Sequence, residues 1–391
     1  MVAMLEITSK DHCSGCFACY NICPKQCISM DSDTEGFVYP SIDASKCVNC
    51  RLCETVCPVI APPQISSRER TSFAAVNLDE SIRLQSSSGG VFTALAEHIL
   101  SQNGVVFGAA LSDNCRNVRH IAVENTVDLE LLRGSKYVQS AIGDTYRLAK
   151  NALEAGRSVL FSGTPCQIAG LHSYLRNSYD KLYTCDVICH GVPSPLVWQK
   201  YVEFREEKAA SKVQKVSFRH KKYSWKSFCM QFTFADGTQY LQPLGKDPYL
   251  HGFLSNLYLR PSCYNCNFKG LSRPADITLA DFWGIENIAP QLNDNKGTSL
   301  VIIHSEKGNN LFAQLRGSMS VQSVDLSKSV KYNSAAEKSV AIPKERVSFF
   351  RHLDTLPFSK LLAKYCSVSP KERLRKAAGR ILRKIKRIRS I

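Results

Sequence analysis

Two runs of cysteines near the start constrain this chain more than any other feature. Cys13 to Pro24 reads CSGCFACYNICP and Cys47 to Pro58 reads CVNCRLCETVCP, so both runs have the same cysteine spacing and end in proline. Short C-x2-C-x2-C loops let three thiolates surround one iron–sulfur cluster, and the fourth cysteine, before proline, reaches the other cluster. The N-terminal part of the chain is therefore predicted to fold around two [4Fe–4S] clusters.

The spacing assigns four thiolates to each cluster, with one ligand exchanged between the runs. Zinc sites rarely use this triple-then-single spacing with a trailing proline, so a pair of zinc knuckles is the weaker alternative. Cys27 has no counterpart in the second run, where Ala61 stands, and is interpreted as a packing residue. The predicted ligands are Cys13, Cys16, Cys19 and Cys57 for the first cluster, and Cys47, Cys50, Cys53 and Cys23 for the second.

Composition and length indicate a metalloprotein of more than one domain. The chain has 391 residues, of which 44% are hydrophobic and 21% charged, as in soluble globular proteins. Residues 1–12 lack the apolar region of a signal peptide, and no apolar run is long enough to span a bilayer. In such a chain, 17 cysteines indicate metal ligation or redox chemistry in a reducing cytosol. A cytoplasmic location is expected.

The chain divides into four predicted parts. Residues 1–60 resemble a bacterial two-cluster ferredoxin, with a short strand expected over Glu35–Asp43. A Pro-rich linker follows over 61–71, then a larger domain over 72–355 and a basic tail over 356–391. In the larger domain TSFAAVN, GVVFGAAL, SVLFSG and ITLADFWG are expected strands, and helices alternate with them. This order predicts an α/β fold, with α+β as the alternative.

Two stretches of the larger domain carry more hydrogen-bonding groups than a core requires. QSSSGG (Gln85 to Gly90) lies at the start of a helix expected over Ser86–Leu100, with serine as its cap. Serine hydroxyls, the backbone amides of glycines and a helix N-terminus can bind a cofactor phosphate. An ordinary helix cap explains the stretch equally well. RGSKYVQS offers Arg133 and Lys136 to a phosphate or a flavin ring, although a solvated basic turn explains it equally well.

Four further cysteines form a dispersed set. Cys166 in GTPCQ and Cys189 in DVICHG each follow an apolar strand and are expected in loops at strand ends, where sites of α/β folds assemble. Cys263 and Cys266 form a C-x2-C pair farther along the chain. Spacing alone leaves four interpretations open: a third cluster, a zinc site, buried free thiols, or a thiol nucleophile at Cys166.

Five stretches in order resemble the coenzyme F420 hydrogenase/dehydrogenase beta-subunit family, over about residues 72–330. They are SSSGGVFTALAEHIL, RGSKYVQS, VLFSGTPCQIAGL, CHGVPSPLVW and ADITLADFWG. The resemblance implies an iron–sulfur flavoprotein with FAD, at least one [4Fe–4S] cluster, and a deazaflavin coenzyme or another reducible substrate. It implies a third cluster on Cys166, Cys189, Cys263 and Cys266, and a flavin region that includes Ser86, Ser87, Ser88, Gly89, Gly90, Arg133, Lys136, Gln139 and Ser140.

The residues and the resemblance together predict an FAD-dependent iron–sulfur oxidoreductase. Clusters pass single electrons whereas most organic substrates change by two, so a flavin is expected between the clusters and the substrate. Lys136, His190 and Asp281 are the candidate proton donors. One alternative is an electron-transfer subunit that has no substrate site and docks on a partner enzyme. Another is a non-catalytic binding module with structural clusters. The redox partner is expected to be a protein or a small-molecule donor or acceptor.

Positive charge concentrates in the tail. Residues 369–391 carry ten Lys/Arg against one Glu, out of a formal net charge of +16, so no general nucleic-acid-binding surface is expected. Leu374, Ala378, Ile381, Ile385 and Ile388 recur at helical spacing opposite the basic residues. Such a basic amphipathic helix suits an anionic membrane surface, here the inner membrane face. A solvated tail and a helix bound to an acidic partner are the alternatives.

Deleting residues 369–391 tests the tail hypothesis. The full chain is expected to cosediment with vesicles that contain anionic lipid, and binding should weaken as salt rises because the attraction is electrostatic. The shortened chain should stay in the supernatant. Equal sedimentation of the two chains would show that the tail is not the membrane contact.

Overall fold

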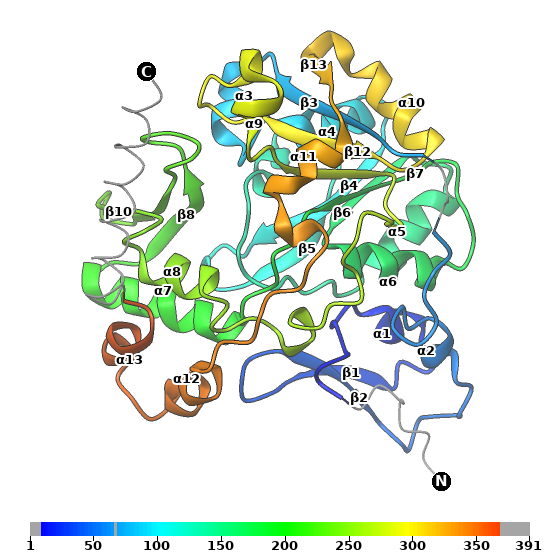
Figure 1. Ribbon diagram of the computed structural model, residues 1–391. Helices are drawn as coiled ribbons and strands as arrows, with labels where there is room; N and C mark the ends of the chain where they lie inside the picture. Colours follow the sequence, from blue (N-terminus) through cyan, green and yellow to red (C-terminus); the bar gives the residue numbers. More distant parts are fainter. Residues whose placement is uncertain (1–8, 66–68, 368–391) are drawn as a thin grey trace.

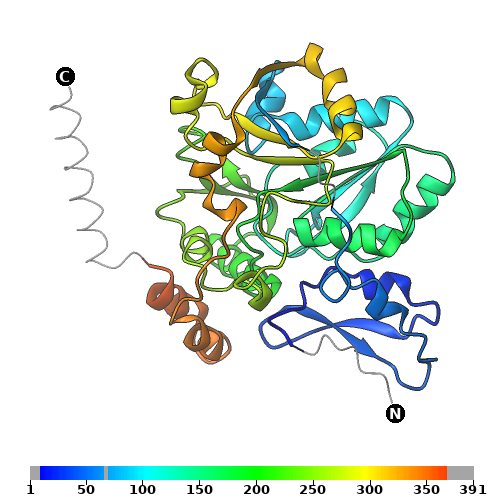
Figure 2. The same cartoon turned by 45° about the vertical axis from the view of Figure 1, so that its right-hand side comes forward.

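The protein is described by a computed structural model that covers residues 9–65 and 69–367. A small N-terminal domain lies beside a larger domain built on a central sheet (Figures 1 and 2). This mixed α/β architecture, with a ferredoxin-like domain in front, confirms the predicted fold class. The predicted tail helix over 369–391 lies outside the described residues.

In the N-terminal domain, both cysteine runs turn into a short helix through a residue in the left-handed conformation. Phe17 precedes α1 (Ala18–Ile22) with φ 67°, and Arg51 precedes α2 (Leu52–Thr55) with φ 56°. The two runs are thus alike in backbone as well as in spacing. Strands β1 (Ile28–Ser32) and β2 (Val38–Ile42) form an antiparallel pair, which confirms the strand expected between the runs.

The larger domain contains an eight-stranded sheet with strand order β13-β3-β12-β11-β7-β6-β4-β5. The four strands β4, β6, β7 and β11 run parallel to their neighbours within this group, and the outer pairs are antiparallel. The expected strands all form. The strands are β3 (Thr71–Asn77), β4 (Val105–Leu111), β5 (Val118–Val123), β6 (Val159–Gly163), β7 (Leu182–Val187), β11 (Ile277–Asp281), β12 (Ser299–Ile303) and β13 (Met319–Ser323).

Helices cover both faces of this sheet because its central strands are apolar on both sides. On one face α4 (Val91–Ser101) and α10 (Glu306–Gln314) pack over side chains such as Val106 and Val301. On the other face α5 (Thr145–Glu154) and α6 (Pro165–Leu175) pack over Phe107 and Phe161. The short helices α3 (Glu80–Gln85), α9 (Ile285–Ile288) and α11 (Leu326–Ser329) lie between these elements in the chain.

The helix expected over Ser86–Leu100 begins later than predicted. The residue before α4 is Gly90, with φ 84°, and it makes no side-chain cap. Ser86 instead ends α3, a helix that the sequence analysis did not expect. The serines between the two helices bond elsewhere: the Ser88 hydroxyl donates to the Thr298 carbonyl oxygen at 2.7 Å. The serine cap was therefore wrong, because glycine supplies the left-handed turn that enters this helix.

A second, three-stranded sheet lies beside the main one, and a helix that packs with it continues past the predicted end of the larger domain. Strands β8 (Val213–His220), β9 (Cys229–Phe234) and β10 (Gln239–Pro243) pack with α7 (Pro195–Ala209), α8 (Pro248–Leu254), α12 (Arg346–Leu353) and α13 (Phe358–Tyr365). Leu361, Leu362 and Cys366 are buried in this cluster. The folded domain therefore reaches at least Cys366, and residues 356–366 are part of the core rather than of a tail.

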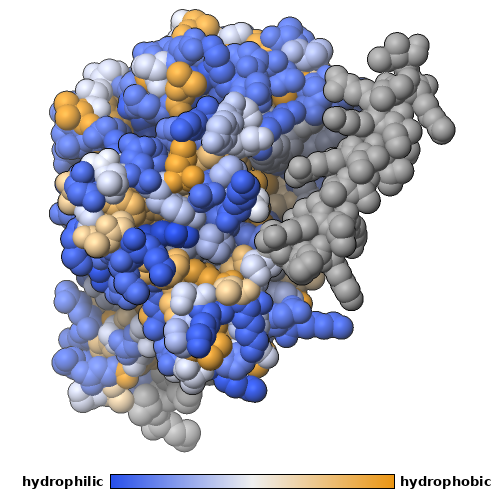
Figure 3. Space-filling view, turned by 90° about the vertical axis from the view of Figure 1, so that its left-hand side faces the viewer, coloured by the Kyte–Doolittle hydropathy of each residue, from blue (hydrophilic) through white to orange (hydrophobic). Residues whose placement is uncertain are grey.

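The surface is mostly hydrophilic on the face shown in Figure 3, with small apolar groups between polar ones. Large exposed apolar side chains such as Val127 and Val347 belong to different elements. Within the described residues, none of the helices combines the length and the apolar character that crossing a bilayer requires.

The N-terminal domain docks on α5 and α6 through close contacts and one buried cation. Gly170 of α6 leaves room for Cys16, since a Cβ at Gly170 would lie 3.0 Å from the Cys16 sulfur. The Arg260 side chain is fully buried at the joint. It donates hydrogen bonds to the carbonyl oxygens of Cys13 (2.8 Å) and Val38 (3.0 Å) and to the Gln139 side-chain oxygen (3.0 Å). These bonds tie the two domains together.

Replacing Arg260 tests this joint. Arg260→Met keeps much of the volume but leaves two buried carbonyl oxygens without donors, which is expected to cost about 3 kcal/mol of unfolding free energy. The exposed Arg316→Met should stay within about 0.5 kcal/mol of the parent chain. Anaerobic denaturant titration followed by tryptophan fluorescence measures both. Equal midpoints for the two variants would contradict the role given to Arg260.

Candidate functional site

The thiols predicted for the first cluster surround one small cavity in the N-terminal domain. Cys13, Cys16, Cys19 and Cys57 line a space of about 20 Å³ with Met30 and Pro40. Burial, together with the neighbouring thiols of Cys57 and Cys13, raises the pKa of Cys16 to about 12. Ligation by a metal would remove this cost, because a bound cation stabilises the thiolate form.

The thiols predicted for the second cluster surround another cavity, of about 30 Å³. Cys23, Cys47, Cys50 and Cys53 line it, so the structure brings together thiols from both runs, as the crossed assignment requires. Cys27 lines the same cavity, with its sulfur 3.3 Å from that of Cys23. The sequence analysis had interpreted this residue as packing.

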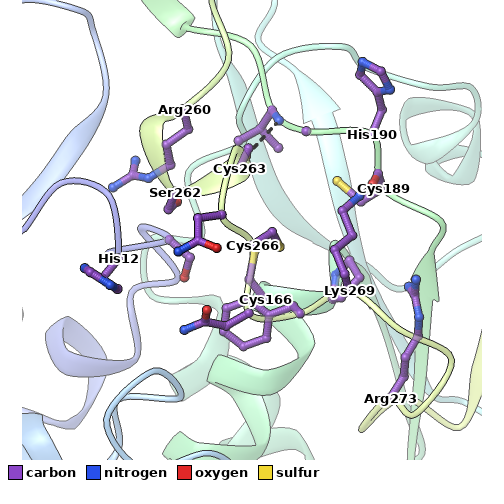
Figure 4. Close-up of a pocket in the computed structure, with 17 residues that line it drawn as sticks. His12, Cys166, Cys189, His190, Arg260, Ser262, Cys263, Cys266, Lys269 and Arg273 are labelled. Carbon is purple, nitrogen blue, oxygen red and sulfur yellow. Dashed lines mark hydrogen bonds between the residues drawn. The ribbon is translucent and has the colours of Figure 1, made fainter. Parts of the chain in front are cut away.

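The dispersed cysteines also converge. Cys166, Cys189, Cys263 and Cys266 line a cavity of about 30 Å³, and Figure 4 shows them around one opening with His12 and Arg260 on the side of the N-terminal domain. Cys189 follows β7, and Cys263 ends the short turn Pro261–Cys263. Cys166 lies in the first turn of α6 rather than in a loop, directly after β6. The parallel strands β6 and β7 thus deliver two of the four thiols to one edge of the sheet.

Cations surround this third thiol set. Lys269, Arg273 and Arg260 line the same cavity, and the Lys269 ammonium donates to the Cys189 carbonyl oxygen at 2.5 Å. Burial raises the pKa of Cys189, and the charge of Lys269 opposes that rise. Burial also raises the pKa of Cys263 to about 12, with the Cys189 thiol adding to it. Fixed cations around buried thiols suit a bound group whose net charge is negative.

The thiols stand apart around these hollows. Over residues 9–65 and 69–367, no three His, Cys, Asp or Glu side chains come close enough to hold a single metal ion. A zinc ion needs four ligands at about 2.0–2.3 Å from one point, whereas a cluster places its thiolates around a larger inorganic core. The three thiol sets are the candidate positions for the predicted iron–sulfur clusters.

A much larger cavity, of about 650 Å³, opens at the carboxyl ends of β6, β7 and β11. Ser162 and Gly163 of β6, Val187 of β7 and Asp281 of β11 form its floor. Ligands of α/β folds bind at this edge of a parallel sheet. Most residues predicted for the flavin line the cavity: Ser86, Ser87, Ser88, Gly90, Arg133, Lys136 and Ser140.

Two family models match the chain. Residues 12–61 match the 4Fe-4S dicluster domain, and residues 156–328 match the model of the C-terminal part of the coenzyme F420 hydrogenase/dehydrogenase beta subunit. Residues 156–328 therefore belong to the coenzyme F420 hydrogenase/dehydrogenase beta-subunit family, in the C-terminal part that its model describes. With a dicluster domain in front, the chain is an iron–sulfur electron-transfer member of this oxidoreductase-related family.

Two known proteins are similar to parts of this chain. An uncharacterized ferredoxin of Methanocaldococcus jannaschii is 36% identical over 60 residues, which are 15% of this chain and 77% of that ferredoxin. A chain in a structure of the F420-reducing [NiFe] hydrogenase complex from Methanosarcina barkeri is 18% identical with a TM-score of 0.47. That match covers 72% of this chain and 90% of the hydrogenase chain.

Two residues predicted for the flavin of this F420-type domain lie outside the large cavity. Gly89 packs so tightly that a Cβ there would lie 2.3 Å from the Ala75 carbonyl oxygen. Its role is to let the serine loop approach β3 and β12. Gln139 faces the N-terminal domain, where its side-chain amide donates to the Ser14 carbonyl oxygen at 3.2 Å and its oxygen accepts from Arg260. Gln139 belongs to the domain joint.

The candidate proton donors Lys136, His190 and Asp281 all line the large cavity. Burial lowers the pKa of Lys136 to about 7, and its ammonium donates to the carbonyl oxygens of Leu131 and Arg133. Burial also lowers the pKa of His190, whose ring lies 2.7 Å from the Asn256 side-chain oxygen. Asp281 forms an ion pair with Arg219. With a pKa of about 7, Lys136 can exchange a proton near neutral pH.

Arg219 was missed by the sequence analysis and lines the cavity beside Asp281. Its side chain is 5% exposed, and among the described residues its Nε and Nη2 atoms have no hydrogen-bond partner. Phe228 packs under the guanidinium, with 4.5 Å between the guanidinium carbon and the ring centroid. The Tyr137 side chain also interacts with this guanidinium, so Arg219 lies on the cavity wall with only part of its hydrogen-bonding capacity used. Only the fold could reveal it, since β8 carries no recognisable motif.

Removing one thiol of the third set tests its predicted ligation. Cys263→Ser should lower the iron content by about four atoms per chain, from about twelve to about eight, and destabilise the F420-type domain, because metal binding contributes to its folding. Cys229→Ala removes a buried thiol that lines none of the three cavities and should keep its iron. Anaerobic iron and sulfide analysis measures both. A parent chain with about eight irons and four alkylatable thiols at these positions would contradict the prediction.

Proposed function

We propose that this protein is an FAD-dependent iron–sulfur oxidoreductase that moves electrons between a redox partner and a reducible substrate. One observation carries the proposal: the 650 Å³ cavity shares Cys189, His190, Gly191 and Val192 with the third thiol cavity. A cofactor in the large cavity would therefore lie against the backbone that presents a cluster ligand. Iron–sulfur clusters supply one-electron steps, and a flavin converts them to two-electron chemistry.

The large cavity suits FAD in its chemistry as well as its size. Hydroxyls of Ser86, Ser87 and Ser88 and the cations Arg133 and Lys136 line one part of it and can bind a pyrophosphate. Apolar and aromatic groups, including Phe253, Leu279 and Trp283, line another part and can pack against a ring system. Arg219 adds free donors beside that aromatic wall.

The thiol cavities form a sequence that leads to the large cavity. Cys16 of the first set packs against α6, whose first turn carries Cys166 of the third set. His12 and Ser14, which flank Cys13, line the third cavity themselves. The chain's own task in this proposal is to hold the first and third sets close to one another and to exclude water from them. The buried thiols and the packed joint support that role.

The second thiol set supports a redox partner protein. Cys50 is exposed, and Val48 in the same loop is 57% exposed, so this cavity opens at the surface of the N-terminal domain. A partner that docked there would lie next to the outermost cluster, and the apolar Val48 would be covered. This favours a second candidate function, an electron-transfer subunit that serves a partner enzyme. Turnover of a soluble donor by the purified chain alone would favour the oxidoreductase over the subunit.

The substrate of the proposed enzyme is a small reducible molecule that reaches the large cavity. A deazaflavin coenzyme is one candidate because the family name includes coenzyme F420. Reduction of a deazaflavin by the chain, compared with reduction of quinone or nicotinamide acceptors under the same conditions, distinguishes these classes. The partner at the second thiol set and the substrate at the large cavity would occupy separate sites on the molecule.

Arg219→Met tests the flavin assignment. Loss of charge-assisted hydrogen bonds worth about 1.5–3 kcal/mol should weaken FAD binding roughly ten- to a hundredfold, while the iron content stays at the parent value. Arg119→Met, on the exposed side of β5, is the matched control and should bind FAD as the parent does. Flavin absorbance and fluorescence of FAD released on denaturation measure both. A parent chain purified without flavin that also fails to bind added FAD would contradict the proposal.

A further inference from the structure

Cys27 lies inside the second thiol cavity together with the four predicted ligands. We infer that Cys27 is a reserve ligand of the second iron–sulfur cluster, able to replace Cys23. The inference rests on the proposed clusters, and it concerns only which thiolate completes one of them. It assigns a metal-binding role to a residue outside the ferredoxin spacing.

Contacts place the Cys27 thiol where a ligand is needed. Cys27 is 6% exposed, and its sulfur lies 3.3 Å from the sulfur of Cys23. The same side chain interacts with Cys47, a ligand from the other run. Cys27 therefore stands between the two groups that the crossed assignment brings to this cluster, and it needs no large movement to exchange with Cys23.

The backbone explains why a residue four positions later returns to the cavity. Gln26 adopts φ 48°, and its amide donates to the Cys23 carbonyl oxygen at 3.2 Å, so the chain after Pro24 turns back on itself. The Asp43 amide then donates to the Cys27 carbonyl oxygen at 2.8 Å and fixes Cys27 at the start of β1. The thiol is held at the cavity by the fold of the domain rather than by chance.

The other half of the repeat supplies a matched control. After Cys57 the chain makes a similar turn, with the Ala61 amide donating to the Cys57 carbonyl oxygen at 2.8 Å. Ala61 stands where Cys27 stands in the first run, so the first cavity has four lining thiols whereas the second has five. Only the second cluster should therefore survive the loss of its ligand Cys23, because only that cavity has a fifth thiol to replace it.

The exchange is a simple ligand substitution. The iron–sulfur bond to Cys23 is replaced by one to Cys27, whose thiol gives its proton to solvent, and no electron is transferred. In a chain that lacks Cys23 the same bond forms during cluster assembly. The ligand set stays four thiolates, so cluster type and charge are retained.

Four full-length variants test this inference by iron content and by the spectrum of the reduced clusters. Cys23→Ala and Cys27→Ala should each keep about twelve irons per chain, like the parent. The double variant Cys23→Ala/Cys27→Ala should fall to about eight, and Cys57→Ala should also fall to about eight because the first cluster has no reserve thiol. Alanine is used because a serine oxygen could itself bind iron.

Alkylation of the native protein gives an independent readout. In the parent, Cys27 should react with iodoacetamide once the N-terminal domain opens locally, because the thiol is buried but not bound to iron. In Cys23→Ala it should stay unreactive until the iron is chelated, because the thiolate is then an iron ligand. A Cys23→Ala chain that loses about four irons, or that fails to fold while Cys57→Ala still folds, overturns the inference. A parent chain that lacks iron at the second site would instead refute the proposed clusters, so the two failures are distinguishable.

Discussion

Arg260 places a full positive charge in the interior at the joint of the two domains, where burial of an unpaired ion is costly. Among the described residues its partners are carbonyl oxygens, the Gln139 amide and the Cys13 sulfur at 3.7 Å, and none is a carboxylate. Its guanidinium faces Cys13 of the first thiol set and lines the cavity of the third. Such a charge is best balanced by anionic groups on both sides, and thiolate-bound clusters in these cavities would provide them.

That one side chain also explains how two separately folded units share a site. The N-terminal domain contributes His12 and Ser14 to the third cavity, and the sheet domain contributes all four of its thiols. An ion pair between Arg346 and Glu35 (2.9 Å between Nη1 and Oε1) holds the other side of the joint. Docking and cavity formation are therefore the same event, and loss of the joint would open the third thiol set to water.

The sequence predicted what local spacing encodes and missed what only packing creates. The cysteine spacing was sufficient to predict the two thiol runs, and the hydrophobic pattern was sufficient to predict the central strands. Both features depend on residues that are neighbours in the chain. Ser86 failed as a helix cap because Gly90 supplies the left-handed turn that serine does not favour. Arg219 and the turn of Gln139 toward Arg260 depend on contacts between residues far apart in the chain, which no motif records.

Charge also differs between the second and third thiol cavities. At the second cavity the exposed Arg51 pairs with the buried Glu54 (2.5 Å), so its positive charge is compensated by a carboxylate. At the third cavity Arg260 and Arg273 are buried and Lys269 is half-buried, so screening is weak. Arg273 pairs with the buried Asp186 (3.3 Å), whereas the printed hydrogen bonds of Arg260 and Lys269 within the described residues go to groups other than carboxylates. A cluster becomes more negative when it accepts an electron, so buried cations stabilise its reduced state and raise its potential. With clusters in all three cavities, electrons that enter at the exposed second set would be drawn inward toward the third, beside the cavity proposed for the flavin.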